Sequence, residues 1–294
     1  MKKVLITGMD SFTGRHLSLY LEQSGYDVYG TSIFKNSDAK VFQCDLTHKE
    51  NVYKLFQAFK PNFLIHLAGI SFAAHGEVQD FYRVNTIGTT NILDAFWELG
   101  VQPQKIVLAS SATIYGNQGV EILDEFLCPK PANHYGASKY AMEALASNYF
   151  SKLPIIITRP FNYTGVGQSD NFLIPKIVKH FREKQKSIEL GNLDVMREFN
   201  DVEFVCEAYR RLLECDSHGE VVNIASNRGI KLLDVMDSMN QIAGYKIEVK
   251  INPAFVRKDE IKSLTGSVQK LFNMVGEIEQ FDFTQTLVKM YRDD

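Results

Sequence analysis

Two stretches, IVLASSATIYG (residues 106–116) and YGASKYAMEALASNY (residues 135–149), combine an apolar strand with a helix that carries a tyrosine and a lysine. Tyr135 and Lys139 are four residues apart in a segment of helical periodicity, so both side chains should lie on one helix face. Tyrosine, with a pKa of about 10, is a poor proton shuttle at neutral pH, and a nearby positive charge lowers that pKa. Ser111 adds a hydroxyl where the strand opens into a loop. The sequence therefore predicts an acid–base set of Ser111, Tyr135 and Lys139.

The N-terminal part of the chain shows the pattern strand, glycine turn, helix. The apolar run of KKVLITG ends at Gly8, and the helix expected over RHLSLYLEQS is followed by Gly25, a residue type that commonly ends helices. In dinucleotide-binding folds, backbone N–H groups at such a helix N-terminus hold a pyrophosphate. The turn is spaced Gly8-x-x-Ser11-x-x-Gly14, and we predict that it binds a dinucleotide.

Together, the Ser111, Tyr135 and Lys139 set and the glycine turn resemble the extended short-chain dehydrogenase/reductase family, which contains nucleotide-sugar epimerases, dehydratases and reductases. The resemblance covers nearly the whole chain and implies an NAD(P)-dependent enzyme. Ser11 departs from the family pattern, which has glycine at that position. Either the turn tolerates the Cβ atom of Ser11, or the hydroxyl donates a hydrogen bond to phosphate.

Strands and helices alternate along the first part of the chain. This alternation predicts an α/β fold with a doubly wound parallel sheet of the Rossmann type, whose ligands bind at the carboxyl ends of the strands. An NAD(P)-binding domain is expected over residues 1–162, with returning segments near 198–215. A smaller, mixed C-terminal substrate lobe that binds the nucleotide sugar is expected over residues 163–294.

Individual elements can be predicted from their apolar spacing and end signals. Thr47 and Glu50 have the spacing of a capping box that opens a helix. A long helix is expected from Phe81 to Leu99, and the resemblance implies that it joins the helix of Tyr135 in the four-helix bundle of a homodimer. His66 lies inside an apolar run and is expected to be a core histidine with satisfied hydrogen bonds.

The residues at the end of the strand DVYGTS bear on the choice of cofactor. An acidic residue there would bind the ribose 2′-hydroxyl of NAD, but the chain has Thr31, Ser32 and Lys35, with no carboxylate to repel a 2′-phosphate. We therefore expect NADP to be preferred, with NAD as the alternative. Besides Tyr135 and Lys139, the resemblance implies cofactor contacts from Gly8, Ser11, Phe12, Gly14, Ser32, Asp45, Leu46, Leu67, Ala68, Gly69, Pro160 and Phe161.

Stretches of sequence in the C-terminal half indicate the class of substrate. Three stretches resemble reductases and dehydratases that act on GDP-linked 6-deoxyhexoses: RPFNYTGVGQSDNFLIPKIV (residues 159–178), GNLDVMREFNDVEFV (residues 191–205) and NPAFVRKDEIKSLTGSVQKL (residues 252–271). That likeness implies nucleotide-sugar contacts from Asn162, Arg197 and Arg257, the arginines as charge-assisted donors. For each arginine, a surface ion pair with a neighbouring carboxylate, Glu198 or Asp259, is an equally open alternative.

The two residues after Ser111 limit the classes of reaction that this chain is expected to catalyse. Sugar dehydratases of this family place carboxylates there, whereas this chain has Ala112 and Thr113, which argues against dehydration. We predict an NADPH-preferring reductase of a GDP-linked 4-keto-6-deoxyhexose, in the biosynthesis of surface-polysaccharide sugars, with Ser111, Tyr135 and Lys139 as catalytic residues. The first alternative is a cofactor-retaining nucleotide-sugar 4-epimerase, because the stretch SSATIYG is more similar to the sequences of epimerases. The second is a non-catalytic dinucleotide-binding regulator on the same fold, which would not need the intact catalytic set.

Composition excludes several other classes of protein. The net charge of −3, without basic clusters, argues against nucleic acid or an anionic membrane as the main partner. No apolar run approaches the roughly 20 residues of a membrane span, and none resembles a signal peptide. The 4 cysteines have neither disulfide-type nor metal-type spacing. We therefore expect a cytoplasmic protein with free thiols and no metal site.

Overall fold

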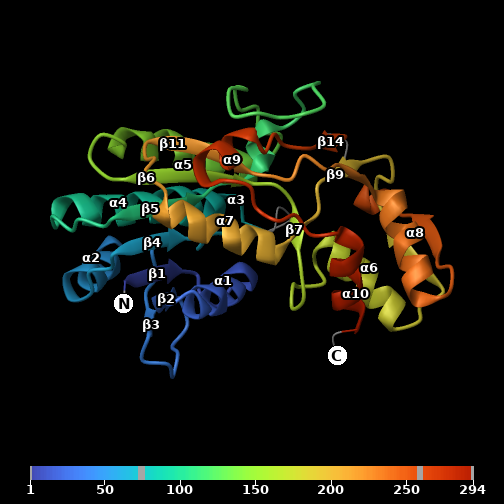
Figure 1. Cartoon of the computed structure of the whole chain (residues 1–294), viewed down its shortest axis with the longest axis horizontal. Helices are drawn as coiled ribbons and strands as arrows, with labels where there is room; N and C mark the ends of the chain where they lie inside the picture. Colours follow the sequence, from blue (N-terminus) through green and yellow to red (C-terminus); the bar gives the residue numbers. More distant parts are fainter. Residues whose placement is uncertain (1, 72–76, 257–260, 293–294) are drawn as a thin grey trace.

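The structure, a computed structural model, describes residues 2–71, 77–256 and 261–292. Within these residues, seven parallel strands form the main sheet, in the order β11-β6-β5-β4-β1-β2-β3 (Figure 1). The order reverses at β1, because the chain continues to β2 and β3 on one side and then crosses to β4 on the other. Such a switch point creates a crevice for ligands at the carboxyl ends of the strands. The strands are β1 (Lys3–Thr7), β2 (Asp27–Ser32), β3 (Val41–Gln43), β4 (Phe63–His66), β5 (Lys105–Ala109), β6 (Ile155–Pro160) and β11 (Glu220–Ile224).

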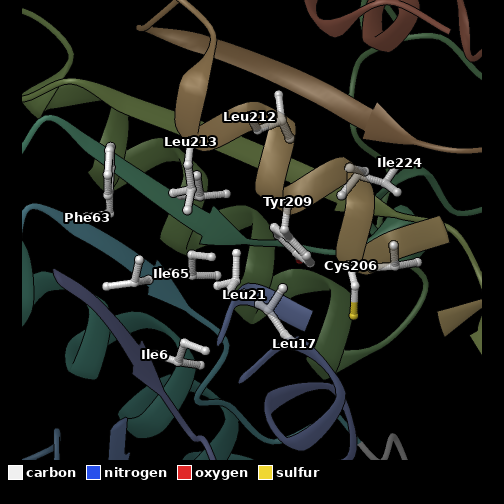
Figure 2. Close-up of a cluster of buried hydrophobic side chains, with 14 of the residues drawn as sticks. Ile6, Leu17, Leu21, Phe63, Ile65, Cys206, Tyr209, Leu212, Leu213 and Ile224 are labelled. Atoms are coloured by element: carbon white, nitrogen blue, oxygen red, sulfur yellow. The ribbon is translucent and has the colours of Figure 1, made fainter. Parts of the chain in front are cut away.

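Helices cover both faces of this sheet, as the predicted doubly wound fold requires. One layer contains α1 (Phe12–Gln23), α7 (Val202–Glu214) and α9 (Gln269–Val275), and the other contains α2 (Lys49–Ala58), α4 (Gly88–Glu98) and α5 (His134–Ala146). Figure 2 shows the core beneath the first layer, where side chains of α1 and α7 meet those of the strands. The labelled residues of this core are Ile6, Leu17, Leu21, Phe63, Ile65, Cys206, Tyr209, Leu212, Leu213 and Ile224.

A second, smaller core holds the C-terminal lobe together, at the end of the molecule that carries α6, α8 and α10 in Figure 1. Its helices are α6 (Leu173–Arg182), α8 (Leu232–Ala243) and α10 (Phe283–Arg292), and its longer strands are β8 (Ser187–Leu190) and β13 (Glu248–Ile251). Five short strands form two further small sheets, in the orders β10-β7 and β12-β9-β14. They are β7 (Tyr163–Thr164), β9 (Met196–Arg197), β10 (Asn200–Asp201), β12 (Ile230–Lys231) and β14 (Ser263–Leu264). Three 3₁₀ turns are also described: η2 (Ala112–Tyr115), η3 (Ser147–Tyr149) and η4 (Pro253–Phe255).

The chain returns from the lobe to the sheet over a longer range than residues 198–215. Helix α7 packs on the sheet through Val205 and Leu212. The strand that joins the sheet edge is β11, which lies beyond that range, and α9 then packs on the same face through Leu271. The two parts are therefore interwoven in sequence.

The helix expected from Phe81 to Leu99 is confirmed, with one difference in its hydrogen bonding: α3 (Val78–Phe81) continues through a π-helical turn η1 (Tyr82–Ile87) into α4. The predicted start of the preceding helix is wrong in detail. The capping box at Thr47 does not form, because Thr47 donates from both its N–H and its hydroxyl to the Asp45 carboxylate, at 2.9 and 2.7 Å. Helix α2 instead begins at Lys49, with His48 at the N-cap position.

His66 is a core histidine, as expected. Its Nδ1 atom lies 2.6 Å from the Thr7 hydroxyl and its Nε2 atom lies 2.8 Å from the Thr89 hydroxyl. Burial lowers the pKa of His66 to about 3, and the nearby charge of Lys139 contributes. The folded protein therefore holds this imidazole in its neutral form at neutral pH.

A buried ion pair fixes α5 to the main sheet. Arg159 of β6 donates from Nη2 to the Glu143 carboxylate of α5 at 2.7 Å and from Nε at 3.1 Å, and both side chains are about 6% exposed. The Nη1 atom of Arg159 donates to the Tyr115 hydroxyl at 2.9 Å, which donates to the Asn223 side chain at 2.7 Å. This network joins α5, β6, η2 and β11.

We predict that acid destabilises the protein through His66. In the unfolded chain His66 binds a proton below its ordinary pKa of 6.5, whereas the folded protein resists protonation until about pH 3, so stability falls as the pH drops through this window. Between about pH 7 and about pH 5, His66 should account for roughly 2 kcal/mol of lost unfolding free energy. Urea unfolding of His66→Gln should show a smaller pH dependence by that amount. The exposed His48→Gln should keep the parent's dependence, and an unchanged His66→Gln would contradict the assignment.

Removing Arg159 should be costly because it leaves a buried carboxylate without its partner. We expect Arg159→Met to lower the unfolding free energy by about 3–5 kcal/mol. The control is Lys179→Met, which breaks an exposed pair with Asp170 and should cost about 1 kcal/mol or less. Denaturant unfolding at neutral pH measures both, and equal losses would show that the buried network does not stabilise the fold as described.

Candidate active site

Ser111, Tyr135 and Lys139 meet beyond the carboxyl end of β5. Ser111 is the N-cap residue of η2, two residues after the strand, and is buried. Tyr135 and Lys139 lie on α5, whose N-terminus is capped by Asn133, with its side-chain oxygen accepting from the Gly136 N–H at 2.9 Å. The structure therefore brings the predicted set together at the sheet edge where doubly wound folds bind ligands.

The hydroxyl of Ser111 is oriented by Thr113. Ser111 Oγ accepts from the Thr113 hydroxyl at 2.9 Å and from the Thr113 N–H at 3.2 Å. Because the oxygen accepts both hydrogen bonds, its own proton remains available to a different acceptor. Thr113 thus makes Ser111 a hydrogen-bond donor toward the site.

The protonation of Tyr135 is set by burial and by Ser111. Burial raises the pKa of the Tyr135 phenol, and the hydrogen-bonding interaction with Ser111 lowers it. The Lys139 ammonium donates to the Ala109 carbonyl at 2.7 Å, and its expected lowering of the Tyr135 pKa stays a prediction. Burial lowers the pKa of Lys139 itself to about 8, and the Glu143 carboxylate opposes that shift.

Asn85 supports the site and was missed by sequence analysis. Its side chain accepts from the Ile70 N–H at 2.8 Å, and donates to the Ile70 carbonyl at 3.2 Å and to Ser138 Oγ at 3.0 Å. A Cβ atom on Gly69 would lie 2.8 Å from Asn85 Oδ1 and 3.2 Å from Lys139 Nζ, so a larger residue there would displace one or both of these side-chain ends. Asn85 lies in the π-helical turn η1 and is fully buried. It therefore links the segment after β4 to α5.

The glycine turn has the geometry of a phosphate-binding turn. Gly8 has a φ of +70°, and a Cβ atom on Gly14 would lie 2.4 Å from the Gly8 carbonyl oxygen. Ser11 has a φ of −69°, which any residue adopts, and its hydroxyl accepts from the Gly14 N–H at 3.1 Å as the N-cap of α1. The turn therefore tolerates serine at position 11. Helix α1 begins shortly after the carboxyl end of β1, so its N-terminus lies at the edge of the sheet where doubly wound folds hold the pyrophosphate of a dinucleotide.

The other predicted cofactor residues lie at the ends of the same strands. Ala68 follows β4 and its Cα atom would lie 2.9 Å from a Cβ on Gly8, while its N–H donates to the Thr7 hydroxyl at 3.2 Å. Ser32 ends β2, and its hydroxyl donates to the Asp10 carboxylate at 2.8 Å. Pro160 is the last residue of β6 and Phe12 is the first residue of α1. The remaining positions follow β3, β4 or β6: Asp45, Leu46, Leu67, Gly69 and Phe161.

Tyr163 connects the glycine turn to the lobe and was also missed. Its hydroxyl lies 2.7 Å from the Thr13 hydroxyl, and its ring stacks on Phe12 with centroids 6.3 Å apart. Burial raises the pKa of Tyr163 to about 12, and the nearby Tyr135 phenol contributes to that rise.

The structure describes two of the three predicted substrate-binding residues, and their surroundings differ. Asn162 follows β6, and its carbonyl accepts from the Asn200 N–H at 2.9 Å. Arg197 is buried on β9, and its guanidinium donates to the carbonyls of Met196 at 2.8 Å and Lys262 at 3.2 Å. Arg257 lies outside the described residues.

The Glu198 carboxylate holds backbone turns. It is fully buried, and burial raises its pKa. Its donors are the N–H groups of Ser226, Asn227 and Gly266 and the side chains of Ser226 and Asn200. Glu198 is therefore a structural carboxylate beneath β9.

Neither a membrane-spanning helix nor a metal-binding cluster occurs in the described part of the chain. No helix there is long and apolar enough to cross a bilayer. No group of three or more histidine, cysteine, aspartate or glutamate side chains there could hold a metal ion.

Comparison with known proteins agrees with the site. The chain is 36% identical to a GDP-6-deoxy-D-talose 4-dehydrogenase of Aggregatibacter actinomycetemcomitans over 293 residues, which cover 99% of this chain and 97% of the relative. The crystal structure of a putative epimerase from Burkholderia cenocepacia is 42% identical, with a TM-score of 0.92 and coverage of 99% and 97%. RMD from Pseudomonas aeruginosa, solved with NADPH, is 27% identical, with a TM-score of 0.88 and coverage of 100% and 98%.

These similarities confirm the expected fold and the expected NAD(P)-dependent type of enzyme. The family model matches residues 4–225, from β1 through β11, and so spans the glycine turn and the Ser111, Tyr135 and Lys139 set. The chain belongs to the NAD dependent epimerase/dehydratase family.

Proposed function

We propose that this protein reduces the C4 carbonyl of a GDP-linked 4-keto-6-deoxyhexose with NADH or NADPH. The observation that carries the proposal is the Ser111, Tyr135 and Lys139 arrangement, followed by Ala112 and Thr113 where a dehydratase would need an acid and a base. The Aggregatibacter relative is named as a 4-dehydrogenase of a GDP-linked 6-deoxyhexose. Oxidation at C4 and reduction of a 4-keto group are the two directions of one reaction, which supports this substrate class.

Each member of the set has a role that follows from its geometry. The bound dinucleotide supplies the hydride. Ser111, with Thr113 occupying its acceptor side, donates to the C4 carbonyl oxygen as negative charge develops there. Tyr135 delivers the proton to that oxygen, because burial holds its phenol protonated. Lys139 is assigned to the nicotinamide ribose, beside Gly69 and the Asn85 network.

The remaining contacts are part of the proposal. The turn from Gly8 to Gly14 would hold the pyrophosphate and the Asp45 turn would face the adenine. Asn162, Arg197 and Arg257 would bind the nucleotide sugar. Support comes from position, since Asn162 follows β6 at the same sheet edge as Ser111.

The choice between NADP and NAD rests on the end of β2. The expectation of NADP assumed that no carboxylate lies near Ser32. In the structure the Asp10 carboxylate accepts from Ser32 Oγ, so that assumption does not hold. The Pseudomonas structure contains NADPH, so the fold is compatible with a 2′-phosphate. The preference between NAD and NADP therefore depends on the side chains at the end of β2.

A homodimer through η1, α4 and α5 is also proposed. Exposed apolar side chains on these elements support it, since Ile87 is 51%, Trp97 48% and Leu145 43% exposed. The role in surface-polysaccharide biosynthesis and the cytoplasmic location stay predictions.

A nucleotide-sugar 4-epimerase is the second candidate, favoured by the putative epimerase from Burkholderia. An epimerase would use the same residues but would return the hydride to the sugar from which it came. The fate of the hydride therefore distinguishes the two activities.

Ser11 should contribute to phosphate binding through its hydroxyl proton, because the oxygen already accepts from Gly14. We expect Ser11→Gly to weaken dinucleotide binding by about 0.5–1.5 kcal/mol, the usual net value of one hydrogen bond. Thermal unfolding without cofactor is the control, since glycine at an N-cap costs only a few tenths of a kcal/mol. Tighter binding by the glycine variant would mean that serine obstructs the phosphate.

Purified protein should oxidise reduced nicotinamide cofactor stoichiometrically when given a GDP-linked 4-keto-6-deoxyhexose. The measurement is the loss of nicotinamide absorbance against the product formed, with dTDP- and UDP-linked sugars as comparisons. Interconversion of 4-epimers by protein that retains NAD⁺, without a net absorbance change, would instead establish the epimerase.

Tyr135→Phe should remove the general acid while leaving cofactor binding nearly intact, since the ribose contact is assigned to Lys139. We expect activity to fall by roughly 10²- to 10⁴-fold. Tyr140→Phe, an exposed tyrosine on the same helix, is the matched control and should keep the parent's activity. A Tyr135→Phe enzyme as active as the parent would refute the proposed role.

A further inference from the structure

The glycine turn is joined to the end of β2 in a way that fixes the position of Asp10. The N–H groups of Gly8 and Met9 both donate to the Thr31 carbonyl at 3.1 Å. A Cβ atom on Gly30 would lie 2.3 Å from Met9 Sδ, so the turn packs on β2 only because residue 30 is glycine. Asp10, the next residue of the turn, is thereby placed beside Ser32, the last residue of β2.

The Ser32 hydroxyl is committed to this arrangement. Its Oγ atom donates to Asp10 Oδ2 at 2.8 Å and accepts from the Phe34 N–H at 3.0 Å. Ser32 is 4% exposed, whereas Asp10 is exposed. The group that this corner presents to a ligand is therefore the Asp10 carboxylate and not the serine hydroxyl.

In dinucleotide-binding sheets, the end of the second strand faces the adenosine ribose. A carboxylate there accepts hydrogen bonds from a ribose 2′-hydroxyl, and it repels a 2′-phosphate through like charge. We propose that Asp10, from the glycine turn, replaces the acidic residue that β2 lacks and makes this protein select NADH over NADPH. This inference rests on the dinucleotide site of the proposed function and names the residue that sets its specificity.

Two cationic side chains, those of Arg15 and Lys35, belong to the segments that follow Asp10 and Ser32 in the chain, and they bear on the binding of a 2′-phosphate. Arg15 donates from Nη1 to the Asp10 carbonyl at 2.7 Å and from Nη2 to the Gly167 carbonyl at 3.4 Å. Lys35, three residues after Ser32, is exposed. Once the Asp10 charge is removed, these side chains would favour a 2′-phosphate, so the variant should gain NADPH affinity as well as lose NADH affinity.

The test is a fluorescence titration of the full chain with NADH and with NADPH, with the ratio of the two dissociation constants as the readout. The parent should bind NADH at least about tenfold more tightly, the value of a hydrogen bond to a charged group. Asp10→Asn keeps an acceptor for the Ser32 hydroxyl and removes the charge, and it should reduce the ratio by roughly tenfold. Asp38→Asn is the control, because it removes an exposed carboxylate from the β2–β3 connection, where Asp38 accepts from the Lys40 N–H. Circular dichroism would confirm that each variant is folded.

A parent that prefers NADPH would overturn the proposal, as would an Asp10→Asn ratio equal to the parent's. An equal change in Asp38→Asn would also overturn it, because the effect would then be general electrostatics. Failure to bind either dinucleotide would refute both this inference and the cofactor site of the proposed function. The expected ratios in a protein that does not reduce GDP-linked keto sugars would support the Asp10 assignment and refute only the proposed reaction.

Discussion

The buried pair of Arg159 and Glu143 is the constraint on which the geometry of the site depends. It holds α5, the helix of Tyr135 and Lys139, against β6, the strand that ends at Pro160 and precedes Phe161. A buried ion pair adds little net stability over apolar packing, but its geometry is demanding because both charges must be satisfied. The Arg159 guanidinium also reaches Tyr115 and, through it, Asn223. A single guanidinium therefore sets the relative positions of α5, β6, η2 and β11.

The parallel sheet brings the residues of the site together at one edge. All seven strands of the described sheet run in one direction, so the segments that follow them meet at one edge. Asp10 and Ser32 come from the ends of β1 and β2, and Ser111 comes from beyond β5. The residues that hold these segments are buried polar groups, such as Asn85 and Glu198, whose hydrogen bonds go mainly to backbone atoms. Buried polar groups that are fully satisfied rigidify the structure around them, as a catalytic arrangement requires.

What the sequence could predict follows from the range of the interactions involved. Tyr135 and Lys139 are related by helical spacing and Gly8 and Gly14 by one turn, so local periodicity sufficed. Asn85 could not be assigned, because its role depends on a π-helical turn and on Ser138, 53 residues away. Asp10 was missed because the search for an acidic residue followed β2, whereas the carboxylate arrives from the neighbouring turn through pairing of β1 with β2. The capping box failed for a local reason, the competing hydrogen bonds of Asp45.

The protonation of Tyr135 bears on which direction of hydride transfer the site suits. A reductase begins its cycle with a protonated phenol, because the nascent alkoxide must receive a proton, whereas an epimerase begins by removing a proton from a sugar hydroxyl. Burial raises the pKa of Tyr135, and the Ser111 hydroxyl only partly opposes that rise. The Lys139 ammonium is held by the Ala109 carbonyl, and burial has already brought its own pKa down to about 8. These groups favour the neutral phenol, which is the form that a proton donor needs. Both candidate activities pass through this form, because an epimerase must also return a proton to the oxygen when it reduces C4 again, so the protonation of Tyr135 fits the reduction step that the two activities share.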